Sequence, residues 1–210
     1  MGHPEKYINE QGYITPRDPY ILAVEEVFGG HVCLDPASSS QANEHSIQAA
    51  YHYDGWPADG LIFGWDSGIA EMHGHTSQWA MTTERWTVFL NPPYGRLFGD
   101  TGPFNVLLWT NKMVKDYRNG KFDEGILLVN AFTGAQWFQK LWQFPICFTD
   151  HRIKFVNPGT MTPDNQPGYY NAFVYMGPRP YHFVDVFSGI GTTVAPIRWS
   201  QDKLIRMGQI

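Results

Sequence analysis

The chain has 210 residues and a net charge of −5, and 43% of its residues are hydrophobic and 16% aromatic. This composition fits one globular domain with a sizeable core and excludes a disordered chain. The acidic charge argues against a large nonspecific nucleic-acid surface, because lysine and arginine dominate phosphate binding. Only Cys33 and Cys147 are present, too few for a disulfide framework or a zinc site.

The N-terminal residues Met1–Gln11 are polar and lack the charged and then apolar pattern of a signal peptide. No apolar run approaches the roughly 20 residues that span a bilayer. We therefore expect a cytoplasmic protein without a membrane partner.

Strand-like and helix-like segments alternate along the chain, which predicts an α/β fold with a mostly parallel twisted sheet and helices on both faces. The predicted helices are Pro19–Phe28, Gln41–Tyr51, Pro103–Arg118, Ala135–Gln143 and Tyr181–Phe187. The predicted strands are His31–Leu34, Leu61–Phe63, Thr87–Leu90, Gly125–Val129, Ile146–Phe148, Asn171–Met176 and Thr193–Ile197. We expect one domain over residues 1–210, with a flexible N-terminus at 1–12. Long loops are expected at 66–85 and 157–170, and such loops are often functional.

The segment His31–Ser40 reads as a short apolar strand, an aspartate and then small residues that open a helix. Ligands of open α/β sheets bind beyond the carboxyl ends of the strands, and small residues let a ligand approach the backbone. Asp35 is therefore a candidate ligand-binding residue. The alternative is that Asp35 only caps the following helix.

Asn91, Pro92, Pro93 and Tyr94 directly follow the apolar run that ends at Leu90. The two prolines remove two backbone donors and fix a rigid turn, which leaves nearby oxygens unpaired. The Asn91 side-chain oxygen and the Pro92 carbonyl could accept the hydrogens of an amine, and Tyr94 could stack on a base taken out of its helix. The alternative is a strand followed by a proline turn with a packed tyrosine. The motif is similar to the catalytic motif of S-adenosylmethionine-dependent amino-methyltransferases that act on adenine, cytosine or glutamine amides.

Several short motifs in a fixed order resemble the phage-type DNA N6-adenine methyltransferase (Dam-like) family. They are Thr15-Pro16, Leu34–Ser38 with Asn43, Asp59–Leu61, Trp65, Asn91–Tyr94 and Arg152–Phe155. The chain departs from the family pattern in its acidic charge and in a long insertion at 66–85.

The resemblance implies a Rossmann-like S-adenosylmethionine-dependent domain that methylates the N6 amine of a flipped adenine in duplex DNA, in the host cytoplasm if the protein is encoded by a phage. It implies a catalytic role for Asn91, Pro92, Pro93 and Tyr94. The cofactor-binding residues that it implies are Thr15, Pro16, Asp35, Pro36, Ala37, Ser38, Asp59 and Asn91. The nucleic-acid contacts are Tyr94, Arg96, Arg152 and Lys154.

Alternatives remain open at the level of the sequence. The substrate could be RNA or a protein glutamine, or the chain could be a noncatalytic nucleic-acid-binding module with the same fold. In a rival arrangement, the cofactor loop would be Asp185–Thr193, which requires a strand before Asp185 and a helix after the glycines. The histidine pairs His73 with His75 and His45 with His52 lack acidic neighbours at ligand spacing, so we expect no metal.

Overall fold

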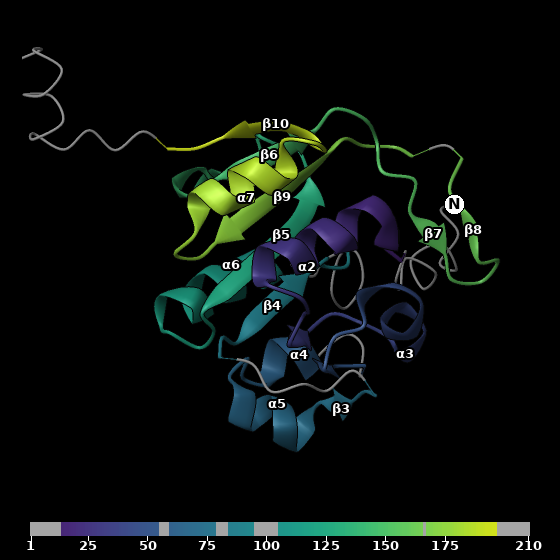
Figure 1. Cartoon of the computed structure of the whole chain (residues 1–210), viewed down its shortest axis with the longest axis vertical. Coiled ribbons are helices and arrows are strands. Elements are labelled where there is room, and N and C mark those ends of the chain that lie inside the picture. Colours follow the sequence, from purple (N-terminus) through teal and green to yellow (C-terminus); the bar gives the residue numbers. More distant parts are fainter. Residues whose placement is uncertain (1–13, 55–58, 79–83, 95–104, 166, 197–210) are drawn as a thin grey trace, which may run out of the picture.

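The computed structural model describes residues 14–54, 59–78, 84–94, 105–165 and 167–196. The described residues form an eight-stranded sheet in the order β10-β6-β9-β5-β4-β1-β2-β3 (Figure 1). Its strands are β1 Leu34–Asp35, β2 Tyr51–His52, β3 His75–Thr76, β4 Thr87–Leu90, β5 Glu124–Asn130, β6 Ile146–Thr149, β9 Asn171–Met176 and β10 Gly191–Val194. A separate hairpin joins β7 Val156–Asn157 to β8 Thr162–Pro163.

The sheet is mixed, with a parallel centre. Strands β2, β1, β4 and β5 pair in parallel in that order. Strand β9 is antiparallel to both β5 and β6, so β6 runs in the same direction as β5. The edge strands β3 and β10 are antiparallel to their neighbours. Most strands of the described sheet therefore share one direction, which agrees with the predicted α/β class.

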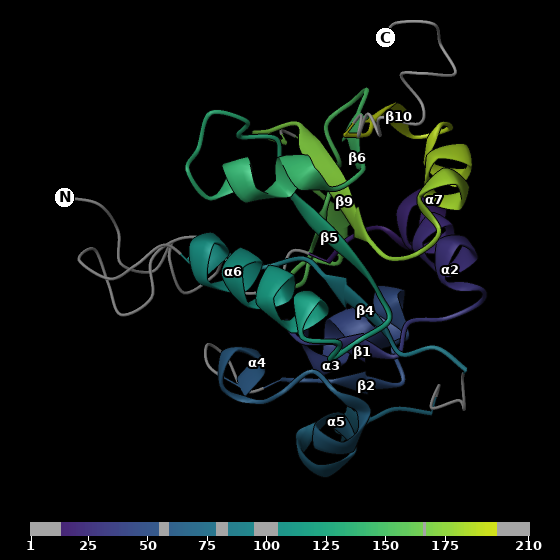
Figure 2. The ribbon, with the colours of Figure 1, turned by 90° about the vertical axis from the view of Figure 1, so that its left-hand side faces the viewer.

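Helices cover both faces of the sheet. The described helices are η1 Arg17–Ile21, α2 Leu22–Phe28, α3 Ser40–Ala42, η2 Asn43–Ile47, α4 Asp59–Ile62, α5 Ser67–His73, α6 Asn105–Arg118, η3 Phe138–Gln143 and α7 Pro180–Phe187. Figure 2 shows α6 on one side of the central strands and α2 with α7 on the other. None of the helices in the described ranges has the length and apolarity that a bilayer crossing requires.

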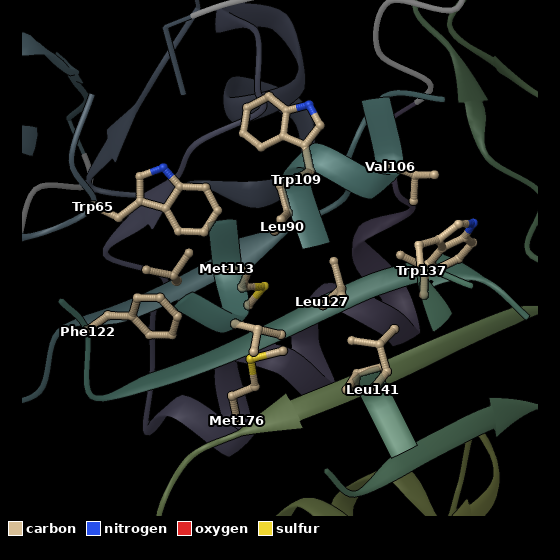
Figure 3. Close-up of a cluster of buried hydrophobic side chains, with 14 of the residues drawn as sticks. Trp65, Leu90, Val106, Trp109, Met113, Phe122, Leu127, Trp137, Leu141 and Met176 are labelled. Atoms are coloured by element: carbon tan, nitrogen blue, oxygen red, sulfur yellow. The ribbon is translucent and has the colours of Figure 1, made fainter. Parts of the chain in front are cut away.

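The core has two parts because successive side chains of a strand point to opposite faces. On β5, Leu127 packs with the cluster that contains Trp109 and Met113 of α6, whereas Ile126 packs with the cluster beneath α2 and α7. Figure 3 shows the first cluster, in which Trp65 and Trp109 approach from one side of β4 and β5. Every residue of β5 is buried, as expected for a central strand. This rigid centre fixes the positions of the strand ends.

One predicted element is wrong, and another extends too far. Leu61 and Ile62 of the predicted strand Leu61–Phe63 lie instead in helix α4, and the N–H of Phe63, directly after the helix, donates to the Asp59 carbonyl at 2.8 Å. A short apolar run has no periodicity that separates a strand from a helix. The predicted helix Gln41–Tyr51 ends at Ile47, because Gln48 adopts the left-handed conformation with φ 54°, and Tyr51 begins β2.

The predicted long loops contain regular structure. Segment 66–85 holds α5 and β3, and segment 157–170 begins within the β7–β8 hairpin. The strand predicted at Thr193–Ile197 begins at Gly191, and that predicted at His31–Leu34 is displaced to Leu34–Asp35. The predicted helix Ala135–Gln143 is a 3-10 helix that starts at Phe138.

The rival cofactor loop at Asp185–Thr193 is also wrong. Asp185 lies inside helix α7, and the glycines after it lead into strand β10 rather than into a helix. The order of elements is therefore the reverse of the strand, loop and helix that such a site needs.

Candidate active site at the ends of strands β1 and β4

Strands β1 and β4 are neighbours in the sheet, and the strands that follow each of them along the chain lie on opposite sides of this pair. From β1 the chain continues to β2 on one side, and from β4 to β5 on the other. Such a switch point opens a crevice beyond the carboxyl ends of the two strands. Asp35 ends β1 and Asn91 follows β4, and both line a cavity of about 620 Å³ at this place. This volume is in the range of small-molecule sites.

Most of the predicted site residues meet in this cavity. Its lining includes Thr15, Asp35, Ala37, Ser38, Asn91, Pro92, Pro93 and Tyr94. The lining does not include Pro16, Pro36, Asp59, Arg152 or Lys154. Arg96 lies outside the described residues. The two sequence motifs that are 56 residues apart, at Asp35 and Asn91, thus form one site because their strands are parallel neighbours.

The Asn91 carboxamide is oriented by a hydrogen bond. Its Nδ2 donates to Thr15 Oγ1 at 3.2 Å, and the Thr15 side chain is buried. The Thr15 backbone carbonyl accepts from Ser46 Oγ, which fixes this segment against η2. With Nδ2 engaged, Asn91 Oδ1 is the end of the amide that is left to accept from a ligand.

The Tyr94 ring is fixed at its hydroxyl. The Asn130 backbone N–H, at the end of β5, donates to Tyr94 Oη. Burial raises the pKa of Tyr94 above its usual range, so the phenol is neutral. Asn130 Oδ1 accepts from Asn171 Nδ2 at 3.1 Å, which joins β5 to β9 at the same edge. The ring therefore lines the cavity as a rigid, uncharged surface.

Asp35 is a buried carboxyl at the cavity. Its Oδ1 accepts from the Ala37 N–H at 3.1 Å, which closes the turn after β1. Burial raises the pKa of Asp35 to about 7, and hydrogen bonds from Ala37 and Ser38 only partly oppose this effect. Asp35 thus orders the turn and faces the cavity. The alternative that it caps the following helix is wrong, because the N-cap of α3 is Ser39, whose Oγ accepts from the Ala42 N–H at 3.1 Å.

The Asp59-Gly60-Leu61 motif supports the turn from behind. A Cβ atom on Gly60 would lie 1.8 Å from the Pro36 carbonyl oxygen and 2.5 Å from the Trp109 ring. Only glycine allows α4 to approach the turn this closely. The Trp65 Nε1 donates to the Gly60 carbonyl at 2.7 Å and holds α4 in place. The structure therefore gives Gly60 a packing role under the cavity and places Asp59 off its lining.

Asp54 is a cavity residue that the sequence analysis missed. It follows β2 and accepts from Ser40 Oγ at 2.6 Å and from the Ser40 N–H at 3.3 Å. The hydrogen bond from the Ser40 hydroxyl is the main cause that lowers the pKa of Asp54. An acidic residue about 20 residues after the first strand end is the position that meets ribose hydroxyls in nucleotide-binding sheets. The spacing from Asp35 could have revealed it, but no strand was predicted here, and the predicted helix Gln41–Tyr51 ran into the start of β2.

The Arg152–Phe155 segment contributes its apolar residues rather than its basic ones. Ile153 and Phe155 line the cavity, whereas Arg152 and Lys154 are exposed. This alternation is that of extended chain, in which neighbouring side chains point in opposite directions. Other lining residues that were not predicted include Asn130, Asp164 and Tyr169.

The charged side chains of the described cavity lining are of one sign. In the parts of the chain that the structure describes, the charged side chains of the lining are Asp35, Asp54 and Asp164, with no lysine or arginine among them. Carboxylates favour a cationic ligand and repel phosphate groups. The described lining therefore favours a positively charged ligand over a phosphate-bearing one.

No group of three or more histidine, cysteine, aspartate or glutamate side chains within the described ranges is arranged to hold a metal ion. The expectation of a metal-free site stays a prediction. In comparisons with known proteins, no family model, no curated protein and no solved structure matches this chain.

Proposed function

We propose that this protein is an S-adenosylmethionine-dependent methyltransferase that modifies the N6 amine of adenine in DNA. The observation that carries the proposal is the Asn91 carboxamide, whose nitrogen is bound to Thr15 so that its oxygen is available to a substrate amine. The Pro92 carbonyl, beside it, accepts from no donor among the described residues. Two oxygens at the cavity can therefore receive the two hydrogens of one amine.

The residues of the cavity fit the proposed cofactor. When bound, S-adenosylmethionine supplies an electrophilic methyl group on a sulfonium. The acidic lining favours its positive charges, and Asp35 is a buried acceptor for its ammonium group. Asp54 is an acceptor for ribose hydroxyls at the position where such sheets bind ribose. Lysine and arginine, which a phosphate-bearing cofactor would call for, are missing from the described lining.

The chemistry of an exocyclic amine explains the residue types at the substrate end. The nitrogen of such an amine is a poor nucleophile because its lone pair is delocalised into the ring. Acceptors at Asn91 Oδ1 and the Pro92 carbonyl draw its hydrogens out of the ring plane and return the lone pair to the nitrogen. The rigid Tyr94 ring offers a stacking surface to a base that has left its helix. These contacts also hold the amine nitrogen in a fixed place, and a fixed geometry relative to the methyl group lowers the barrier to transfer.

A transfer assay tests the proposal directly. Purified protein is incubated with S-adenosylmethionine that carries a tritiated methyl group and with duplex DNA, RNA or protein. We expect label in DNA, released by nuclease and recovered as N6-methyladenine. Asn91→Ala should abolish transfer while calorimetry still detects cofactor binding. Asn119→Ala, at an exposed position after α6, is the matched control and should retain full activity.

The possible results separate the alternatives. Label that is sensitive to ribonuclease or protease would move the same chemistry to RNA or to a glutamine side chain. Absence of S-adenosylmethionine binding would leave a noncatalytic module and overturn the proposal. Substantial transfer by Asn91→Ala would remove the catalytic role of the carboxamide. Mapping of methylated adenines in host DNA after expression of each variant then identifies the target sequence.

A further inference from the structure

Exposed aromatic side chains gather at one side of the cavity mouth. Phe132 is 41% exposed, Tyr169 56% and Tyr170 51%, and Tyr169 itself lines the cavity. The Phe132 and Tyr169 rings meet edge to face with centroids 4.9 Å apart. The Arg152 guanidinium lies over the Tyr170 ring, 5.1 Å from its centroid. We call these four residues the aromatic platform.

The platform is held by the sheet. The Ala131 N–H, directly after β5, donates to the Tyr170 carbonyl at 2.8 Å, directly before β9. Arg152 Nη1 donates to the Pro167 carbonyl at 3.2 Å and so ties the loop before Tyr169 to the chain after β6. Exposed aromatic rings that are fixed in this way lose little conformational entropy when they bind a partner.

The platform is joined to the proposed substrate site. Asn130, two residues before Phe132, donates its backbone N–H to Tyr94 Oη. Tyr169 shares the cavity wall with Tyr94. If one base of a nucleic acid stacks on Tyr94, the nucleotides next to that base would therefore contact the platform.

The charges of the platform and of the cavity are opposite. The charged side chains of the described cavity lining are all carboxylates, whereas the basic residues Arg152 and Lys154 are exposed beside the cavity. In a chain with a net charge of −5, this separation matches a cationic cofactor inside and a polyanion outside. Aromatic rings with an adjacent guanidinium are also the surface on which unstacked bases and their phosphates bind. A glutamine side chain of a protein substrate would need neither feature.

We propose that the aromatic platform binds the nucleotides that flank the target base, and that the polymer is DNA. This inference rests on the proposed function for its target base and for the choice of DNA over RNA, but it concerns the binding of the polymer and is tested without methyl transfer. Phe132 and Tyr170 provide stacking surfaces, and Arg152 pairs with a phosphate.

The test measures affinity for short fluorescent DNA of mixed sequence, single-stranded and duplex, and for RNA of the same sequence, in the absence of cofactor. Phe132→Ala and Tyr170→Ala should each weaken single-stranded DNA binding by roughly tenfold, the effect of losing one stacked base. Arg152→Gln should also reduce the slope of log affinity against log salt by about 1. Tyr170→Phe should retain near-normal affinity, because the ring remains.

Tyr181→Ala is the matched control, because Tyr181 is 80% exposed on α7, which follows the opposite end of β9. It should leave DNA affinity unchanged. Thermal unfolding of every variant checks that each is folded, and S-adenosylmethionine affinity should not change in the Phe132 and Tyr170 variants, which lie off the cavity lining.

Equal DNA affinity in the platform variants and in Tyr181→Ala would overturn the inference even if methyl transfer to DNA were established. Binding of RNA in place of DNA would overturn the choice of polymer. Conversely, platform-dependent DNA binding without any methyl transfer would support the platform while the proposed function fails. The two proposals therefore fail independently.

Discussion

The Asn91 Nδ2 lies 3.2 Å from Thr15 Oγ1, although the two residues are 76 positions apart in the chain. This hydrogen bond selects one orientation of a side chain whose two ends are chemically opposite. Rotation of the amide by half a turn would place two nitrogen hydrogens where a substrate amine needs an acceptor. Thr15 is in turn fixed, because Ser46 binds its carbonyl and Arg17 Nη1 donates to the Ser46 carbonyl at 2.8 Å.

Thr15 is therefore a positioning residue for Asn91. Thr15→Val keeps the shape of the side chain and removes the acceptor, and we expect kcat to fall roughly 10- to 100-fold with a smaller change in KM for DNA. Thr15→Ser restores the hydroxyl and should recover most of the activity. The measurement is steady-state methyl transfer with both substrates varied. A normal kcat in Thr15→Val would show that Asn91 is oriented without this bond.

Asp35 makes the stability of the protein depend on pH. Its pKa is raised from 3.8 to about 7 in the folded state, so the folded protein retains a proton that the unfolded chain has lost. The contribution of Asp35 to stability is most favourable below the lower pKa and falls as pH rises through this window, by at most about 4 kcal/mol for three units. Asp35→Asn keeps the acceptor for Ala37 and cannot ionise. Its melting temperature should exceed that of the wild type increasingly from about pH 4 to about pH 7. A constant difference across that window would contradict a raised pKa.

The same carboxyl should release a proton when a cationic ligand binds. A positive charge beside Asp35 favours the carboxylate, and near neutral pH part of the population is still protonated. Calorimetry of S-adenosylmethionine binding in two buffers of different ionisation enthalpy should then give different apparent enthalpies. With Asp35→Asn the difference should disappear. An equal buffer dependence in both proteins would assign the proton to another group.

The parts of the fold that could be predicted from the sequence are those whose pattern is local. Strand β5 is a continuous apolar run and α6 has a long helical pattern, and both were predicted. Strand β2 consists only of Tyr51 and His52, too short for any alternation, and it exists because β1 pairs with it. Leu61–Phe63 was predicted as a strand because so short an apolar run has no periodicity that distinguishes a strand from a helix.

The residues of the candidate site also fall into those that a local sequence pattern predicts and those that only the folded sheet brings together. Asp35 was predicted from its place at a strand end and Asn91 from its motif, and the two meet because β1 and β4 are parallel neighbours whose carboxyl ends lie at one edge. Asn130 ends β5 and Asp54 follows β2. They reach the cavity because of the order of strands in the sheet, and this order could not be predicted from the sequence. In Arg152–Phe155 the resemblance pointed to the charged residues as nucleic-acid contacts, whereas the residues that line the cavity are the apolar Ile153 and Phe155.

The close approach of α4 to the turn after β1 gives a prediction about Gly60. In Gly60→Ala the new methyl group would overlap the Pro36 carbonyl oxygen, 1.8 Å away, and this contact is with backbone that cannot rotate aside. We expect a loss of roughly 1–3 kcal/mol in the free energy of unfolding. Because the displaced turn carries Asp35, affinity for S-adenosylmethionine should fall as well. Urea unfolding and calorimetry measure the two effects.

Gly68→Ala is the control for this substitution. Gly68 lies within α5, and the nearest atom to an added Cβ is Asp66 Oδ1 at 3.9 Å. Alanine in a helix without a clash is neutral or stabilising by about 0.5–1 kcal/mol. Stability of Gly60→Ala equal to that of Gly68→Ala would mean that α4 can move away from the turn at no cost. In that case Gly60 would not be what positions Asp35 at the cavity.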